Sequence, residues 1–210
     1  TLALVALRLP ETLAHRNPKA LQPRALVGTW MQVLRSPTFW AFSLQTTATY
    51  GGLFTFLAAS SFVFIQVLGL SKTAYGLVMS TVSLAYIGGT FVCRRLLPRL
   101  GVRRTVAVAA ALTLTGGTLM GVLALAGVRS VWAIVLPFYL FMIAHGVHQP
   151  CGQSGAVGPF PQAAGAASAL SGFLITVVAF AMGGWLGLHL KVGTAGTVLP
   201  LTNGIWFWAV

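Results

Sequence analysis

The chain has 210 residues, of which 57% are hydrophobic and only 7% are charged, and its mean hydropathy is +0.86. Soluble domains carry roughly 25% charged residues, so this composition excludes a soluble globular domain and indicates an integral membrane protein. The formal net charge of +12 would suggest nucleic-acid binding in a soluble protein, but the basic residues here lie in short runs between long apolar segments. They therefore indicate membrane topology, and no nucleic-acid partner is expected.

The first part of the chain is expected to lie outside the main bundle. Residues 1–8 are mostly apolar and look like the end of a preceding transmembrane helix. Residues 9–37 form the one extended polar stretch, and its prolines would interrupt any long helix, which predicts a cytoplasmic linker. Between Leu26 and Leu34 the apolar residues recur at helical spacing, which predicts a short helix lying on the membrane surface. Ser36, followed by proline, suits the N-cap of the next helix.

Five apolar segments then follow, each of the roughly 20 residues or more that a helix needs to span a bilayer. They cover about 38–63, 74–97, 105–127, 131–154 and 164–189, and a partial sixth segment covers 199–210. Residues 38–210 are therefore expected to form a transmembrane helix bundle. The sequence has no initiator Met and no signal peptide, so it is interpreted as a fragment of a longer polytopic protein.

The distribution of basic residues predicts how these spans are oriented. One side of the membrane would receive five basic residues from 8–37 and five from 94–104, whereas the alternate connections hold only Lys72, Arg129 and Lys191. The positive-inside rule places the richer side in the cytoplasm. Cys93 and Cys151 lie near that reducing side, in separate helices, and no disulfide is expected.

Paired glycines recur in the spans, for example at Gly88-Gly89, Gly116-Gly117 and Gly183-Gly184. Apolar surface alone does not drive helices together in lipid, and small residues allow backbones to approach closely. The pairs therefore predict tight helix packing. None of the complete spans has a charged residue in its middle, so no obvious proton carrier lies in this part of the protein.

Residues 145–155 read HGVHQPCGQSG and contain the residue types of a metal site or a nucleophile. His145, His148 and Cys151 could share one side of a helix, but Pro150 is expected to disturb that helix, and no further ligand lies nearby. We expect no metal. The Gly-x-Ser-Gly around Ser154 resembles that of rhomboid intramembrane proteases, which pair the serine with a later histidine.

The only later histidine is His189, and the predicted topology puts it about 30 Å from Ser154, at the other side of the membrane. We expect no catalytic residue and no cofactor. What remains is a polar cluster of His145, His148 and Gln149 in an apolar helix. Such groups are expected to face other helices or a water-filled cavity, and the sequence leaves both possibilities open.

Three stretches together resemble a known family. They are LRLPETL at 7–13, SSFVFIQVLGLSKTAYG at 60–76, and GPFPQAAGAASAL at 158–170. Their order and spacing are similar to those of the Bcr/CflA branch of the major facilitator superfamily, which comprises proton-driven multidrug exporters of bacterial inner membranes. The third stretch carries the helix-turn signature Pro159, Phe160, Pro161 and Gly165. The resemblance implies an all-α polytopic fold: helices seven to eleven of the C-terminal six-helix half, with parts of helices six and twelve.

The resemblance also implies a mechanism. Superfamily transporters rock two six-helix halves about a site near the bilayer midplane, and helices seven and ten line the cavity. The cavity candidates on the corresponding segments are Gln45, Thr49, Tyr50, Phe54, Phe138, Phe141, His145, His148 and Gln149. An aromatic-rich cavity with few polar groups suits small lipophilic or cationic substrates. The other implied partners are protons, membrane lipids and the missing N-terminal half of the same protein.

The loop at 88–104 is similar in position to the superfamily's Gly-x-x-x-Asp-Arg-x-Gly-Arg-Arg turn. Gly101, Arg103 and Arg104 fit the end of that motif, but the acid is absent. With Arg94 and Arg95, these arginines are expected to set the topology and to contact lipid phosphates at the cytoplasmic face. Most proton coupling would then reside in the missing half, although His145 or His148 could contribute, because histidine titrates near neutral pH.

Two other functions stay open. A porter of the same superfamily for a sugar, an organic acid or an amino acid would need more polar or charged cavity residues. An intramembrane serine protease is the alternative from a different class of protein. The sequence thus predicts a proton-coupled drug or small-molecule exporter of the bacterial inner membrane, present as part of its C-terminal half.

Overall fold

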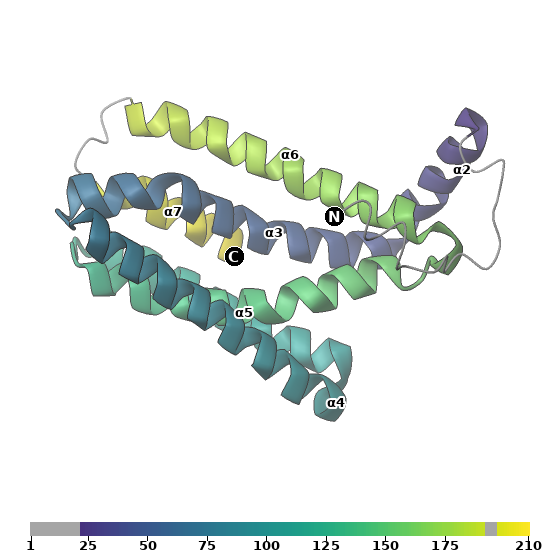
Figure 1. The fold of residues 1–210 in the computed structure, drawn as a ribbon, viewed down its shortest axis with the longest axis horizontal. Coiled ribbons are helices and arrows are strands. Elements are labelled where there is room, and N and C mark those ends of the chain that lie inside the picture. Colours follow the sequence, from purple (N-terminus) through teal and green to yellow (C-terminus); the bar gives the residue numbers. More distant parts are fainter. Residues whose placement is uncertain (1–21, 192–196) are drawn as a thin grey trace, which may run out of the picture.

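The computed structural model describes residues 22–191 and 197–210, which form helices joined by short turns, with no β-strand among them (Figure 1). The helices are α2 (Pro23–Leu34), α3 (Pro37–Ser61) with a π-helical extension (Phe62–Val67), α4 (Lys72–Leu125), α5 (Val131–Val157), a short 3-10 helix (Pro161–Ala163), α6 (Ala164–Lys191) and α7 (Leu199–Ala209). The predicted end of a preceding helix, the first part of the linker and the LRLPETL stretch at 7–13 lie outside the described residues.

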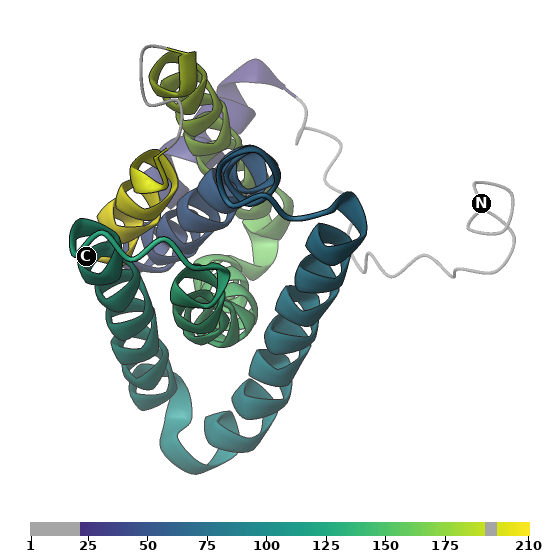
Figure 2. The same ribbon diagram turned by 90° about the vertical axis from the view of Figure 1, so that its left-hand side faces the viewer.

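Four helical segments of the described part are long and apolar enough to cross a membrane: Pro37–Val67, Lys72–Leu125, Val131–Val157 and Pro161–His189. The second has 54 residues because it contains two of the predicted spans. The chain reverses between them at Gly101, whose φ of 71° is readily adopted only by glycine. Figure 2 shows the result: a first arm (residues 72–100) and a second arm (residues 102–125), joined by the turn.

α5 lies between the two arms of α4 (Figure 2), and glycines make this arrangement possible. A Cβ atom on Gly89 of the first arm would overlap the backbone of Ile143, and one on Gly146 would lie 2.5 Å from the carbonyl oxygen of Tyr86. On the second arm, a Cβ atom on Gly116 would lie 2.6 Å from the carbonyl oxygen of Pro137. The predicted tight packing through glycine is confirmed at these contacts.

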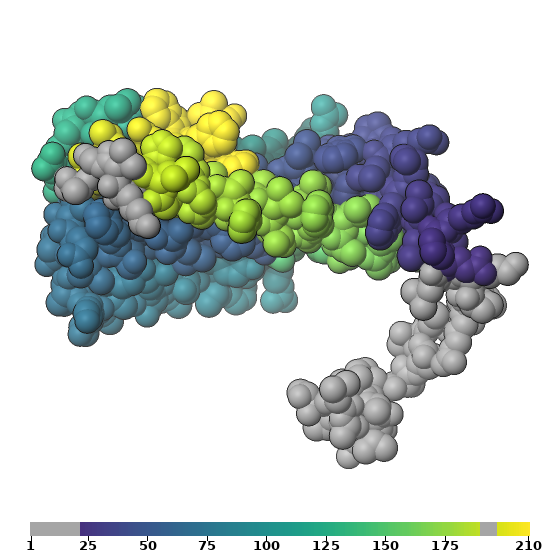
Figure 3. Space-filling view, turned by 90° about the horizontal axis from the view of Figure 1, so that it is seen from above, coloured from purple at the N-terminus to yellow at the C-terminus, as the bar shows by residue number. Residues whose placement is uncertain are grey.

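The glycines of α6 do not follow the prediction. Gly183, Gly184 and Gly187 have no atom of the described chain within 4 Å of a built Cβ atom, and the same holds for Gly88. The space-filling view in Figure 3 shows α6 exposed along one face of the molecule, with α2 at one end. Glycine pairs in a membrane helix therefore mark possible close approaches, but only the neighbouring helix decides which of them are used.

α2 begins at Pro23 and has exposed apolar side chains at Val27, Trp30 and Met31, as expected for a helix at a membrane surface. The indole N–H of Trp40 donates to the carbonyl of Leu34 over 2.7 Å and connects the end of this helix to α3. The predicted N-cap is confirmed, because the Ser36 hydroxyl accepts a hydrogen bond from the N–H of Phe39.

Candidate functional site

A pocket of about 220 Å³ opens where α3, the first arm of α4 and α5 meet. Its lining consists of Tyr50 and Leu53 from α3, Ser83 and Tyr86 from α4, and Met142 and His145 from α5. Aromatic and aliphatic side chains with a few polar groups are the usual composition of a small-molecule site. No charged side chain lines the pocket, so electrostatic recognition there depends on ring faces and neutral hydrogen-bonding groups.

His145 lies at the inner wall of this pocket, between two tyrosines. Its ring centroid is 4.8 Å from that of Tyr50, with the planes at 89°, and 5.7 Å from that of Tyr86. The side chain is only 2% exposed, and its Nδ1 atom is buried without a hydrogen-bond partner among the described residues. Buried polar groups in proteins are nearly always hydrogen-bonded, so His145 has a bonding capacity that this part of the chain does not use.

His148 lies one turn further along α5 and is bonded at both ring nitrogens. The Gln45 amide bonds Nδ1, and the Thr113 hydroxyl lies 3.2 Å from Nε2. If the amide donates to Nδ1, then Nε2 carries the proton and donates to Thr113. This histidine joins α3, α5 and the second arm of α4. Gln45 and His148, both predicted to line the cavity, thus form a partly buried structural link.

The other polar candidates lie around the pocket. The side chain of Gln149 lies near that of Tyr50, and Phe54 packs on Tyr50 with ring centroids 5.8 Å apart. Thr49 is buried, and its hydroxyl donates to the carbonyl of Thr46. Of the candidates predicted from the sequence, only Tyr50 and His145 line the pocket itself.

Phe138 and Phe141 occupy a different place from the predicted one. Neither has any exposed surface, Phe138 stacks on Phe56 with ring centroids 3.8 Å apart, and Phe141 stacks on Phe138 at 5.6 Å. The ring of Phe141 fills the space left by the missing side chain of Gly52. Both rings therefore belong to the core between α3 and α5.

The sequence analysis did not single out Ser83 and Tyr86. These two residues stand three positions apart on the first arm of α4, so they share a helix face, and they are followed at the same spacing by Gly89, which contacts α5. A polar pair aligned with a packing glycine is the signal that could have identified this third wall.

The arrangement does not support serine chemistry. The Ser154 hydroxyl donates to the carbonyl of Pro150 over 2.7 Å, near the end of α5. His189 lies near the last residue of α6, and the chain runs the length of that helix between them (Figure 1). Nucleophile and base would have to lie about 3 Å apart. α5 continues through Pro150 to Val157, so this proline does not end the helix.

In the part of the chain that the structure describes, no three His, Cys, Asp or Glu side chains lie close enough together to hold a metal ion. Cys93 and Cys151 are both buried and free, and their sulfur atoms lie 3.7 Å apart, across the contact between the first arm of α4 and α5.

The two predicted loop motifs have structural roles. Arg94, Arg95, Arg103 and Arg104 are exposed on either side of the Gly101 turn. In the helix-turn signature, Phe160 is buried against α2, α3 and the ends of α5 and α6. Pro161 begins the 3-10 helix, Pro159 is exposed, and Gly165 has open space beside it. The turn is therefore held mainly by one aromatic anchor.

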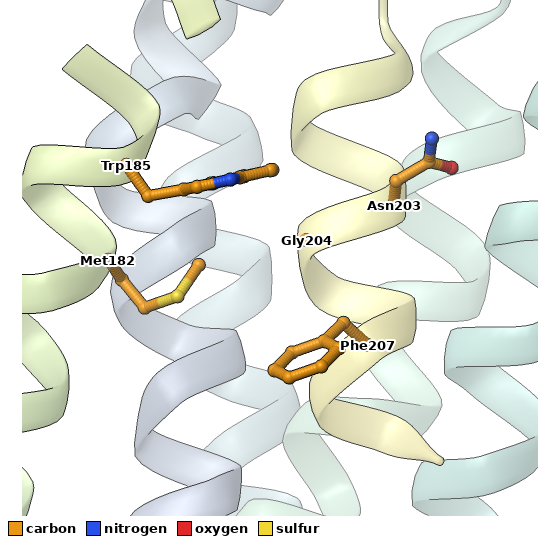
Figure 4. Close-up of a pocket in the computed structure, with 5 residues that line it drawn as sticks. All are labelled: Met182, Trp185, Asn203, Gly204 and Phe207. Atoms are coloured by element: carbon orange, nitrogen blue, oxygen red, sulfur yellow. The ribbon is translucent and has the colours of Figure 1, made fainter. Parts of the chain in front are cut away.

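A second pocket, of about 280 Å³, lies between α6 and α7 (Figure 4). It is lined by Met182, Trp185, Asn203, Gly204 and Phe207. It includes none of the cavity candidates predicted from the sequence. The two helices approach within this lining, where a Cβ atom on Gly204 would lie 3.3 Å from the Trp185 ring.

Comparison with known proteins gives this geometry its context. The family model of the Major Facilitator Superfamily matches residues 1–184. A bicyclomycin resistance protein homolog of Haemophilus influenzae is 24% identical over 94% of this chain and 49% of its own length. Multidrug resistance protein D of Escherichia coli is 29% identical over 79% of this chain and 41% of its own length. A chloramphenicol resistance protein of Pseudomonas aeruginosa is 23% identical over 81% of this chain and 38% of its own length.

The chain spans about half the length of these relatives or less. No solved structure matches it. The names of the three relatives agree with the branch that the sequence motifs predict. With the family match over most of the chain and its long apolar helices, these findings show that the chain belongs to the Major Facilitator Superfamily of transporters and is not an enzyme.

Proposed function

We propose that the chain forms the C-terminal half of a drug exporter that works by alternating access, and that the pocket around His145 is part of its substrate cavity. The pocket itself is the observation that carries this proposal: three helices bring aromatic rings, aliphatic side chains and one unbonded histidine together without a charged group. Such a surface suits lipophilic or cationic compounds, because tyrosine faces attract cations and apolar walls accept hydrocarbon.

The small size of the pocket supports a cavity that is completed by a second half of the protein. Sites for drug-sized ligands commonly enclose about 300–1,000 Å³, whereas this pocket has about 220 Å³. In this proposal, residues of an N-terminal half complete the cavity near the bilayer midplane, and rocking of the two halves exposes it to either side in turn.

Protons are the proposed energy source, and the N-terminal half is the proposed site of their carrier. The only acid of this chain is Glu11, in the predicted linker. A membrane carboxylate is the common proton relay in transporters, and this chain contributes none to its spans. The protein would lie in a bacterial inner membrane, with the arginines around Gly101 facing the cytoplasm and anionic lipid.

The test uses the full-length protein in cells and a broad panel of lipophilic and cationic compounds. We expect the protein to lower their accumulation. Ser83→Trp, which fills the pocket, should abolish this effect. Ser80→Trp is a matched control: Ser80 is also exposed on the first arm and also donates to the carbonyl four residues earlier, but it does not line the pocket.

Unchanged accumulation of every compound, with the wild-type protein present in the membrane, would overturn the proposal. Equal effects of the two tryptophan variants would show that the pocket is not part of the substrate cavity. Energised uptake of a sugar, an organic acid or an amino acid by the same protein would favour the other porter function instead.

A further inference from the structure

We infer that His145 selects substrates through a hydrogen bond, so that the site prefers aromatic amines carrying an N–H group over fully N-alkylated ammonium compounds of similar size. This inference rests on the proposed function. It goes further by assigning a chemical class of substrate and one specificity-determining side chain.

The first argument is the contrast between two histidines of one helix. Both are 2% exposed, but His148 has a partner at each ring nitrogen, whereas His145 has none among the described residues. A buried polar group without a partner is costly, and more so in a membrane, where water does not readily replace the missing bond. A ligand group that reaches this imidazole gains a hydrogen bond that no residue of the described chain makes.

The second argument is that the ring of His145 is held in place. Tyr50 meets it edge to face from α3, and Tyr86 packs on it from the first arm of α4. A side chain fixed from two helices loses little conformational freedom when a ligand binds, so more of the bond appears as affinity. Two tyrosine rings thus lie beside this imidazole, and aromatic rings attract cations.

The third argument is the absence of an acid. The described part of the chain contains no Asp or Glu, so this wall of the cavity cannot recognise an amine by an ion pair. A neutral imidazole nitrogen can accept a hydrogen bond from a protonated amine, and the alkyl and aryl groups of the amine would contact Leu53 and Met142. A quaternary ammonium group keeps the attraction of the rings, but it leaves the histidine unbonded.

Two other polar groups of the pocket define the competing explanations. The Ser83 hydroxyl already donates to the carbonyl of Met79 over 3.0 Å. The Tyr86 hydroxyl could also bond an amine, so the experiment must separate its contribution from that of His145.

The experiment measures equilibrium binding to the purified full-length protein in lipid nanodiscs. The probes are a lipophilic aromatic tertiary amine and its N-methyl quaternary analogue. The pH is about 8, where a histidine with the ordinary pKa of about 6.5 is neutral, and the amine is chosen to be basic enough to stay protonated. The readout is the ratio of the two dissociation constants, which does not depend on how much of a variant is active.

We expect the wild-type protein to prefer the tertiary amine about tenfold, the equivalent of one charge-assisted hydrogen bond. His145→Phe keeps an aromatic ring and should reduce the ratio to about one, mainly by weakening the tertiary amine. His145→Gln keeps a hydrogen-bond acceptor and should retain part of the preference. Tyr86→Phe should leave the ratio unchanged.

A wild-type ratio near one, or an unchanged ratio in His145→Phe, would overturn the inference while leaving drug export intact. Collapse of the ratio in Tyr86→Phe alone would assign the selection to the tyrosine and would also overturn it. If neither probe, nor any other compound of the panel, binds or is exported by the wild-type protein, the proposed function fails together with the inference.

Discussion

α5 and α6 have nearly equal lengths, 27 and 28 residues, and both are predominantly apolar, but they are packed very differently. In the most apolar part of each helix, 61% of α5 is buried and only 17% of α6. α5 meets its neighbours through Gly146 and Gly152, whereas Gly183 and Gly184 of α6 face open space. Composition alone therefore does not determine the environment of a membrane helix.

Polar links explain part of the difference. α5 is joined to α3 and to the second arm of α4 through His148. Between α5 and α6, the Gln153 amide donates a hydrogen bond to the Ser168 hydroxyl over 3.2 Å, near one end of both helices. In lipid, close backbone approach and hydrogen bonds hold helices together, and α5 has both.

The largest effect is expected from Gly89→Ala, in the contact between the first arm of α4 and α5. The new Cβ atom would overlap the backbone of Ile143, which cannot yield as a flexible side chain would. Overpacking costs typically 1–3 kcal/mol and more where backbone must move, so we expect about 3 kcal/mol or more of destabilisation. Gly88→Ala is the matched control, because nothing lies within 4 Å of that position.

Thermal stability and recovery of monodisperse full-length protein in detergent would measure both variants. Equal behaviour of the two alanine variants would show that α5 is not held by backbone contact with the first arm.

The next effect concerns the two histidines. His148→Phe removes both of its hydrogen bonds and leaves Gln45 and Thr113 without that partner, which should lower stability by about 1–3 kcal/mol. His145→Phe removes no hydrogen bond within the described chain and should leave the melting temperature nearly unchanged. The same melting assay compares the two variants. A larger loss of stability in His145→Phe than in His148→Phe would show that His145, and not His148, is the structural histidine.

A smaller but specific effect is expected at the two cysteines. Their sulfur atoms, 3.7 Å apart, need to approach by about 1.7 Å to form a disulfide. Oxidation with copper phenanthroline should therefore join Cys93 to Cys151 within one chain, as detected by mass spectrometry of alkylated peptides. Cys93→Ser is the control. Failure of the folded protein to form this bond, while copper phenanthroline joins a cysteine pair introduced elsewhere in the same membrane, would argue against the close contact of these helices.

Much of this fold could be predicted from sequence, because long apolar segments and the Gly101 turn leave few alternatives. The orientation of individual residues could not. His145 and His148 differ by about 60° around α5, and only the identity of the flanking helices decides which of them faces a pocket. Phe141 was predicted to line the cavity, but it enters the core because Gly52 lies opposite. Apolar helices carry little periodicity to show such pairings in advance.

The smallest effect is expected at Gly184→Ala in α6. No atom of the described chain lies within 4 Å of the new methyl group, and alanine favours a helix over glycine by roughly 0.5–1 kcal/mol. The isolated half should therefore keep or slightly gain thermal stability, in contrast to Gly89→Ala. The same substitution in the full-length protein provides a second reading. A loss of stability confined to the full-length protein would show that its other half covers this glycine face, and that α6, unlike α5, receives its packing partner from outside the bundle described here.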